Sequence, residues 1–288
     1  MAKKETRKVQ IAVIGGSGLY NMEALTDTRE VKIKTPFGTP SDAIVTGEIG
    51  GVAVAFLPRH GRGHKFLPSE IPQRANIWAL KSLGAKTIIS VSAVGSLRED
   101  YKPRDFVFPD QLVDETKGRA STFFGNGVVA HASFAEPFCN NLSELLYARA
   151  KKLGISAHRG GTLVCMEGPQ FSTRAESEYH RKMGYSLIGM TAVPEAKLAR
   201  EAQMCYVPVS LVTDYDAWKA GEEVSSTMVV ETLHHNIALV KQLLADAIPA
   251  VAAAPVTCAC GGSMKSAVFT DFKVINKAAL SKLKVLLD

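Results

Sequence analysis

Short apolar runs that alternate with amphipathic helical segments constrain the fold of this chain more than any other feature. The runs are typical of strands and lie at residues 9–14, 52–57, 87–91, 161–166, 187–188 and 206–212. Helices are predicted at 73–83, 142–153, 172–183, 194–205 and 227–248. Strands that alternate with helices predict an α/β fold with one mixed central sheet flanked by helices on both faces. In such sheets the ligand site lies beyond the carboxyl ends of the strands.

The chain is predicted to form a single domain with two appendages. A basic tail, the main domain and a C-terminal arm that packs on it occupy residues 1–8, 9–248 and 249–288. The long helix at 227–248 is expected to end at Pro249, because proline lacks a backbone donor and clashes with the preceding turn. A terminal amphipathic helix is expected within the arm, at 271–287.

Composition excludes several classes of protein. Of 288 residues, 46% are hydrophobic and 22% are charged, which excludes an intrinsically disordered chain. No apolar run approaches the roughly 18 residues that a membrane-spanning helix needs. The N-terminus also lacks the apolar stretch of a signal peptide. We therefore expect a cytoplasmic protein without a membrane partner.

The net charge of +6 leaves two interpretations open. Lys3, Lys4, Arg7 and Lys8 place part of this charge in the first eight residues, where Glu5 opposes it. A solvated tail is the favoured interpretation, so no nucleic-acid partner is expected. Binding to nucleic acid that weakens steeply with salt would mark the alternative.

Neither the cysteines nor the histidines show the spacing of a metal site. Cys258 and Cys260 are the only close cysteine pair among five cysteines, and no second pair or histidine pair accompanies them. His60 and His64 are four residues apart, but the glycines between them argue against the helix that would bring both to one ion. We expect reduced thiols and no metal.

Polar or glycine-rich segments follow four of the predicted strands. They are Gly15-Gly16-Ser17-Gly18, Arg59-His60-Gly61, Ser92-Ala93 and Thr213-Asp214-Tyr215-Asp216. Backbone N–H groups in a glycine turn and the fixed charge of an arginine suit an anion, to which His60 is also expected to donate. Two carboxylates beside a buried strand end are costly unless they are used or paired. Taken singly, each segment is explained equally well by a tight turn, a surface pair or close packing.

Six longer segments, taken in this order, resemble the purine nucleoside phosphorylase superfamily and, within it, the 5′-methylthioadenosine phosphorylases. They are VIGGSGL, PRHGRGH, PSEIPQRANIWALKSLGAKTIISVSAVGSL, MEGPQFSTRAES, GMTAVPEAKLAREAQMCY and TDYDAW. The match covers roughly residues 9–245, so the resemblance makes 9–248 a phosphorylase catalytic domain.

This resemblance implies phosphorolysis in purine and methionine salvage. Orthophosphate attacks C1′ of 5′-methylthioadenosine, adenine leaves, and 5-methylthioribose 1-phosphate forms. Orthophosphate is a co-substrate, no cofactor or metal is implied, and a homotrimer or a pair of trimers is expected. The alternative within the superfamily is a phosphorylase for 6-oxopurines (methylthioinosine, inosine or guanosine). A nucleotide-binding dehydrogenase is suggested only by the glycine-rich first turn, which lacks the G-x-G-x-x-G spacing.

The resemblance also assigns residues by motif position. Phosphate binding falls to Ser17, Arg59, His60, Ser92, Ala93 and Thr191. Nucleoside binding falls to Phe171, Ser172, Met190, Thr213, Asp214, Asp216, His64, Thr227 and Val230. His131 is expected to reach the site of a neighbouring subunit. The implied catalytic residues are Asp214, which protonates N7 of the leaving base, Asp216, which accepts from its 6-amino group, and His60.

Two departures from the family pattern and one covalent feature complete the expectations. Gly189 stands where many relatives carry asparagine, and Glu231 stands where an apolar residue is expected near the thioether. In an oxidising compartment or a heat-loving organism, the resemblance implies disulfides that leave Cys165 free and join Cys258 to Cys260 and Cys139 to Cys205.

Overall fold

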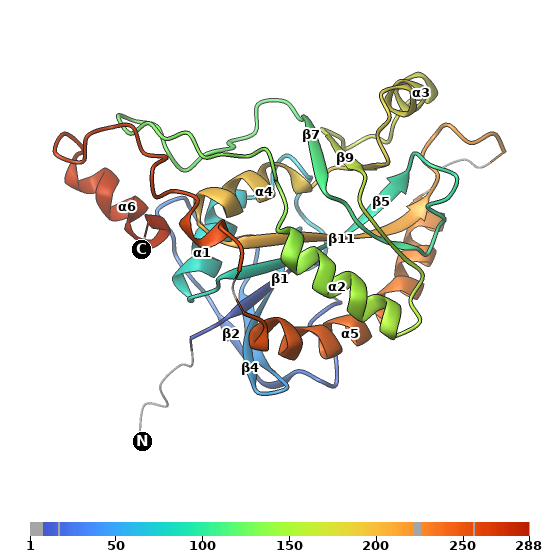
Figure 1. Cartoon of the computed structure of the whole chain (residues 1–288), viewed down its shortest axis with the longest axis horizontal. Coiled ribbons are helices and arrows are strands. Elements are labelled where there is room, and N and C mark those ends of the chain that lie inside the picture. The colour runs from blue at the N-terminus through green and yellow to red at the C-terminus, as the bar shows by residue number, and fades with distance from the viewer. Residues whose placement is uncertain (1–7, 17, 222–225, 256, 288) are drawn as a thin grey trace.

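Eleven strands form one sheet in the computed structural model, which describes residues 8–16, 18–221, 226–255 and 257–287. The strands are β1 (Ile11–Gly15), β2 (Thr26–Val31), β3 (Ile44–Ile49), β4 (Val52–Pro58), β5 (Thr87–Ser96), β6 (Phe106–Phe108), β7 (Gln111–Glu115), β8 (Ala157–Arg159), β9 (Thr162–Met166), β10 (Leu187–Gly189) and β11 (Cys205–Asp214). The helices are α1 (Gln73–Ser82), α2 (Asn140–Lys152), α3 (Arg174–Lys182), α4 (Ala192–Glu201), α5 (Ser226–Ala253) and α6 (Lys277–Leu287), with a short 3-10 helix at Cys260–Gly262. The predicted α/β fold is confirmed (Figure 1).

The sheet is mixed, as predicted. Its main path runs β2-β3-β4-β1-β5-β10-β9-β7, and β11 pairs with β5 on a branch that continues through β6 to β8. Strands β4, β1, β5 and β11 are parallel to their neighbours in that series. The pairs β2–β3, β3–β4 and β5–β10 are antiparallel. The carboxyl ends of β4, β1, β5 and β11 therefore meet at one edge.

Strand β5 changes partners along one of its edges. Thr87–Ser90 pairs with β1, whereas Gly95 and Ser96 pair with β10. The register of neither pair includes residues 91–94, although β11 pairs with them on the other edge. The strand order also reverses here, because β4 and β5 lie on opposite sides of β1, and α/β sheets bind ligands at such a switch point.

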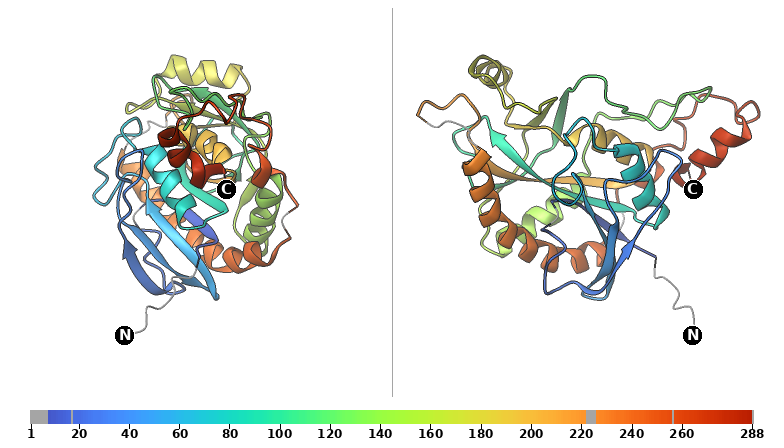
Figure 2. Two further views of the ribbon diagram at one scale, coloured as in Figure 1. Left: turned by 90° about the vertical axis from the view of Figure 1, so that its left-hand side faces the viewer. Right: turned by 180° about the vertical axis from the view of Figure 1, so that it is seen from behind.

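Helices cover both faces of the sheet, and the alternation of side chains in β1 explains how. Ile11 and Val13 pack in a core with α2 and α5, whereas Ala12 and Ile14 pack in a second core with α1, α4 and α6. Successive side chains of a strand point to opposite faces, so a continuously apolar strand serves two layers. Figure 2 shows the layers from the side and from behind.

Helix α5 does not end at Pro249, so that prediction was wrong. The helix continues to Ala253, with Pro249 inside it. A Cβ added to Gly50 would lie 2.7 Å from Pro249 Cγ, so the ring packs directly on the β3–β4 turn, and this packing offsets the lost hydrogen bond. The C-terminal arm begins as helix rather than as a linker.

The same helix contains a stretch, Val229–Ala253, that is long and apolar enough to cross a membrane by length and composition alone. Part of this stretch is buried: Val240, Leu243, Leu244 and Ile248 lie fully buried in the core shared with α2, whereas Val230 is 48% exposed.

Other differences from the predicted elements concern weak patterns. Strand β2 was not predicted because its sequence, TDTREV, is an exposed edge strand without apolar alternation. Helix α6 begins at Lys277 rather than Asp271. It packs on α1, where Trp78 Nε1 donates to Lys282 O at 3.1 Å.

Candidate active site

A cavity of about 530 Å³ opens at the carboxyl ends of β1, β4, β5 and β11. Small-molecule sites typically measure roughly 300–1,000 Å³. Of the predicted site residues, those that line it are Arg59, His60, His64, Ser92, Ala93, Phe171, Met190, Thr191, Thr213, Asp214, Asp216 and Val230. Residues from distant parts of the sequence thus meet in one cavity, at the edge where the strand pattern places a site.

Arg59 follows β4 and is held by a buried hydrogen-bond network. Its Nε and Nη2 donate to the two carboxylate oxygens of Glu195, at 2.8 and 3.0 Å. Nη2 also donates to Ser90 Oγ at 2.7 Å, and Nη1 donates to Val91 O at 2.9 Å. Tyr206 donates its hydroxyl to the same carboxylate at 2.9 Å. Arg59 and Glu195 are only 3% and 0% exposed.

The charge of Arg59 is therefore compensated within the protein by Glu195. Burial lowers the pKa of Arg59, but the charge of Glu195 and its hydrogen bonds outweigh burial and raise the pKa above its usual value. The guanidinium has five N–H donors, and these contacts use four of them. One Nη1–H therefore remains for a ligand within the described surroundings.

His60 is neutral at physiological pH. Its Nδ1 lies 2.9 Å from Phe66 O, and because a carbonyl only accepts, Nδ1 carries the proton. Burial, with the nearby Arg59 and His64 charges, lowers the pKa of His60 to about 4. The ring stacks on His64 with centroids 4.1 Å apart. His60 Nε2 is therefore a hydrogen-bond acceptor, rather than the expected donor.

Two hydroxyls meet at the switch point of the sheet. Ser92 Oγ on β5 lies 3.2 Å from Thr191 Oγ1, which precedes the first turn of α4. Ser92 belongs to the stretch of β5 that pairs with neither β1 nor β10. Two hydroxyls beside an unpaired stretch of strand edge are suited to an anion.

Asp214 and Asp216 lie at the end of β11, where both are buried. Asp214 Oδ2 accepts from Thr213 Oγ1 at 2.7 Å, and Oδ1 accepts from the Asp216 backbone N–H at 2.8 Å. Burial raises the pKa of Asp214, and the charge of Asp216 adds to the effect, although the two hydrogen bonds oppose it. Asp216 Oδ2 is buried without a hydrogen-bond partner among the described residues. A carboxyl group with a raised pKa and a buried carboxylate oxygen without a described partner therefore lie two residues apart at the end of β11.

Comparison with known families decides which proteins share this arrangement. The model of the phosphorylase superfamily matches residues 10–249, which is most of the chain. The chain belongs to the phosphorylase superfamily. This membership leaves the dehydrogenase and nucleic-acid alternatives without support.

Relatives of this superfamily member are similar over nearly their whole length. The S-methyl-5′-thioadenosine phosphorylase of Geobacter sulfurreducens is 50% identical over 279 residues, which cover 96% of this chain and 97% of the relative. A crystal structure of a methylthioadenosine phosphorylase from an antarctic soil metagenomic library superposes with a TM-score of 0.94 at 48% identity, covering 97% of this chain and 99% of the other. The methylthioadenosine phosphorylase of Schistosoma mansoni in complex with adenine gives 0.86 at 38% identity, covering 90% and 99%.

Some residues that the family resemblance assigns to substrate binding do not line the cavity. Ser172 Oγ contacts Met166 Sδ at 3.8 Å, and Thr227 is exposed on the first turn of α5. His131 is exposed outside the cavity, where its ring contacts Phe269. Ser17 lies outside the described residues.

Glu231 and Gly189, which depart from the family pattern, lie differently relative to the cavity. Glu231 is exposed and does not line the cavity, whereas the apolar end of the cavity is formed by Val229, Val230, Leu233 and Ile237 of α5. The carboxylate therefore leaves the apolar character of that end unchanged. Gly189 does line the cavity.

Sequence reasoning missed two residues that hold the site together. One is Glu195, whose only sequence signal was a carboxylate among the apolar residues of α4. The other is Arg119, whose Nη1 donates to Met190 O and Val193 O at 2.7 and 2.8 Å. Arg119 Nε also binds Glu167 at 2.9 Å, so the arginine fixes the segment that carries Thr191.

Proposed function

We propose that this chain catalyses phosphorolysis of 5′-methylthioadenosine to adenine and 5-methylthioribose 1-phosphate. The observation that carries the proposal is the separation of two kinds of group along β5. Ser92, with Thr191, stands at one place on the strand, and Asp214 pairs with Gly95 further along it. Three residues of a strand span about 10 Å, which leaves room for a ribose between an anion and a base.

The base end of the cavity fits an adenine leaving group. As the C1′–N9 bond breaks, its electron pair moves into the imidazole ring of the base, and a proton at N7 stabilises it. We place that proton on Asp214, whose pKa burial raises, and solvent reprotonates the side chain after the base leaves. Asp216 Oδ2 is available to accept from the 6-amino group.

The selectivity for a 6-aminopurine follows from the same acceptor. A 6-oxopurine presents a carbonyl where adenine presents an amino group, so two acceptors would face each other. Such a mismatch of buried polar groups discriminates by several orders of magnitude. The apolar side chains of α5 at the far end, Val230, Leu233 and Ile237, suit a methylthio group better than a hydroxyl.

At the phosphate end, orthophosphate is bound mainly by hydrogen-bond donors, because Glu195 neutralises the charge of Arg59. The Ser92 and Thr191 hydroxyls and the remaining Arg59 Nη1–H donate to phosphate. Neutral His60 accepts from a protonated phosphate oxygen or a sugar hydroxyl through Nε2. A phosphate oxygen then attacks C1′ as the bond to adenine lengthens.

The deciding experiment measures phosphate-dependent release of free base from a panel of nucleosides. The panel contains 5′-methylthioadenosine, adenosine, methylthioinosine, inosine and guanosine, each with and without orthophosphate. We expect adenine release from methylthioadenosine only with phosphate, slower cleavage of adenosine, and no cleavage of the 6-oxopurines. Equal cleavage of inosine would replace the proposal by the 6-oxopurine alternative, and no release from any nucleoside would overturn it.

The remaining aspects of the proposal rest on the family resemblance. We propose a cytoplasmic homotrimer, or a pair of trimers, that acts in purine and methionine salvage and needs no cofactor. The exposed His131 beside Phe269, which is 71% exposed, supports a role in a neighbouring subunit's site. Light scattering gives the mass of the assembly, and mixing His131→Ala chains with Asp214→Asn chains tests for a shared site, because mixed trimers would then recover activity.

A further inference from the structure

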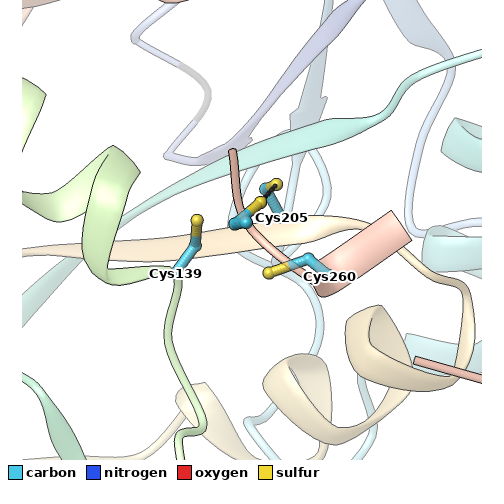
Figure 3. Close-up of side chains that lie close together, drawn as sticks. Cys139, Cys205 and Cys260 are labelled. Atoms are coloured by element: carbon cyan, nitrogen blue, oxygen red, sulfur yellow. Dashed lines mark hydrogen bonds between the residues drawn. The ribbon is translucent and has the colours of Figure 1, made fainter. Parts of the chain in front are cut away.

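Four cysteine side chains converge on one point, far from the cavity residues used above. The Sγ atoms of Cys139, Cys205, Cys258 and Cys260 all lie within 4.8 Å of one another, and Cys205 and Cys258 are 3.3 Å apart. Figure 3 shows three of them approaching from the start of α2, the start of β11 and the C-terminal arm. All five cysteines are free, so the disulfides that the resemblance implies are absent from this structure.

The spacing of the four sulfurs matches a closed metal site. Zn²⁺ bound by four thiolates at about 2.3 Å in a tetrahedron requires sulfurs about 3.8 Å apart. The sequence-distant pair, Cys205 and Cys258, is 3.3 Å apart and no pair of the four exceeds 4.8 Å, so the cluster has the size that such a site requires. Sequence reasoning found no zinc site because Cys258 and Cys260 have no close second pair, and the fold supplies that pair from Cys139 and Cys205.

The surroundings favour bound metal over four isolated thiols. Cys139 and Cys260 are buried in the core shared by α2, α5 and the sheet, and Cys205 and Cys258 pack against that core. Cys139 also precedes the first turn of α2, where the helix dipole stabilises negative charge.

We propose that Cys139, Cys205, Cys258 and Cys260 bind one zinc ion that fastens the C-terminal arm to the catalytic domain. All four positions of the ion are filled by protein sulfur, so the site is structural and leaves no position for substrate. On binding, the metal displaces the thiol protons and forms four zinc–sulfur bonds without any oxidation. The inference is independent of the proposed activity.

The decisive test measures metal content and spectrum together. The full-length protein is purified anaerobically with reductant from cells supplied with zinc, and bound zinc is counted by mass spectrometry. It is then exchanged for Co²⁺, whose tetrahedral tetrathiolate complexes show intense visible bands and sulfur-to-metal charge transfer. We expect one zinc per chain and the tetrathiolate cobalt spectrum.

Matched variants assign the ligands. Cys258→Ser and Cys139→Ser should lose at least tenfold in zinc affinity and shift the cobalt spectrum, whereas Cys165→Ser should retain both. Cys258 is only partly buried, so its variant should fold, and far-ultraviolet circular dichroism checks that it does. Chelation should lower the melting temperature of the wild type more than that of Cys258→Ser.

Two results would overturn the proposal. One is reduced, folded protein that binds neither zinc nor cobalt at the four cysteines. The other is protein trapped by alkylation inside cells that carries Cys139–Cys205 and Cys258–Cys260 disulfides in place of metal.

Discussion

Replacing Asp214 by Asn isolates the proton that the proposed mechanism places on this side chain. Asparagine keeps the shape and both contacts of the aspartate. Its Oδ1 accepts from the Asp216 N–H, and its Nδ2 donates to Thr213 Oγ1, whose own hydrogen then turns to Val94 O at 3.2 Å. The variant therefore removes an acidic proton and very little structure.

The size of the loss follows from the chemistry. A positioned general acid contributes about 10²–10⁴-fold, which at 1.36 kcal/mol per tenfold is about 2.7–5.4 kcal/mol of barrier. We expect kcat on methylthioadenosine to fall by that factor. Asp216, the acceptor that faces the 6-position, is unchanged in this variant, so cleavage of inosine should stay at its very low level.

The same substitution should lower kcat without lowering the free energy of unfolding. Burial raises the folded-state pKa of Asp214 above its unfolded value, so its ionisation in the folded protein is unfavourable. Below the unfolded pKa this penalty is absent; it grows as the pH rises, and it is complete above the folded pKa. Asp214→Asn carries no such penalty, so at pH 7 its free energy of unfolding should equal or exceed that of the wild type.

Three measurements check this prediction. They are adenine release under saturating substrate, urea unfolding at pH 7, and the pH profile of kcat, whose fall at high pH should be present in the wild type and absent in the variant. Asp216→Asn is the matched control, because it should weaken binding of the 6-amino group more than it changes the proton transfer. A kcat within threefold of the wild type in a folded Asp214→Asn protein would refute the assignment.

Three further predictions concern groups that support the site. Arg59→Ala should raise the KM for phosphate about ten- to hundredfold, the value of a charge-assisted hydrogen bond, as phosphate titration will show. It should also destabilise the fold by about 3–5 kcal/mol in urea unfolding, because it leaves buried Glu195 unpaired. Arg59→Met combined with Glu195→Gln should recover most of that stability but not the phosphate affinity; recovery of both would make Arg59 purely structural. Gly95→Ala should lower kcat at least tenfold with little change in phosphate KM, because its Cβ would lie 3.0 Å from Asp214 Oδ1 and from Ile188 Cγ2; steady-state kinetics decide this.

The strands and their ends could be predicted from sequence because they depend on local pattern. Apolar runs followed by glycine, arginine, serine or aspartate placed Arg59, Ser92 and Asp214 at one edge, where the structure has them. The partners of these residues could not be predicted in the same way. Glu195 lies 136 residues from Arg59, so no periodicity links them.

Predictions from local sequence propensity were also wrong where tertiary packing determines the structure. Proline usually ends a helix, but Pro249 is accommodated within α5 by close packing against Gly50. The four cysteines show the same limit, because the contacts that unite Cys139, Cys205 and the C-terminal pair come from the sheet and the arm together. Motif positions alone likewise placed Ser172 and Thr227 in a cavity that they do not line.

The change of partners along β5 has a consequence for how such enzymes diversify. In the proposed function, the phosphate lies against the stretch of β5 that pairs with neither β1 nor β10, and against the Ser92 and Thr191 hydroxyls. The same proposal places the base and the 5′ end against side chains beyond the strand and on α5, such as Asp216 and Val230. Substitutions beyond the strands and on α5 can therefore change the nucleoside specificity without changing the phosphate site. The phosphate site depends on the strand pairing of the sheet, which point mutations at those positions leave unaltered.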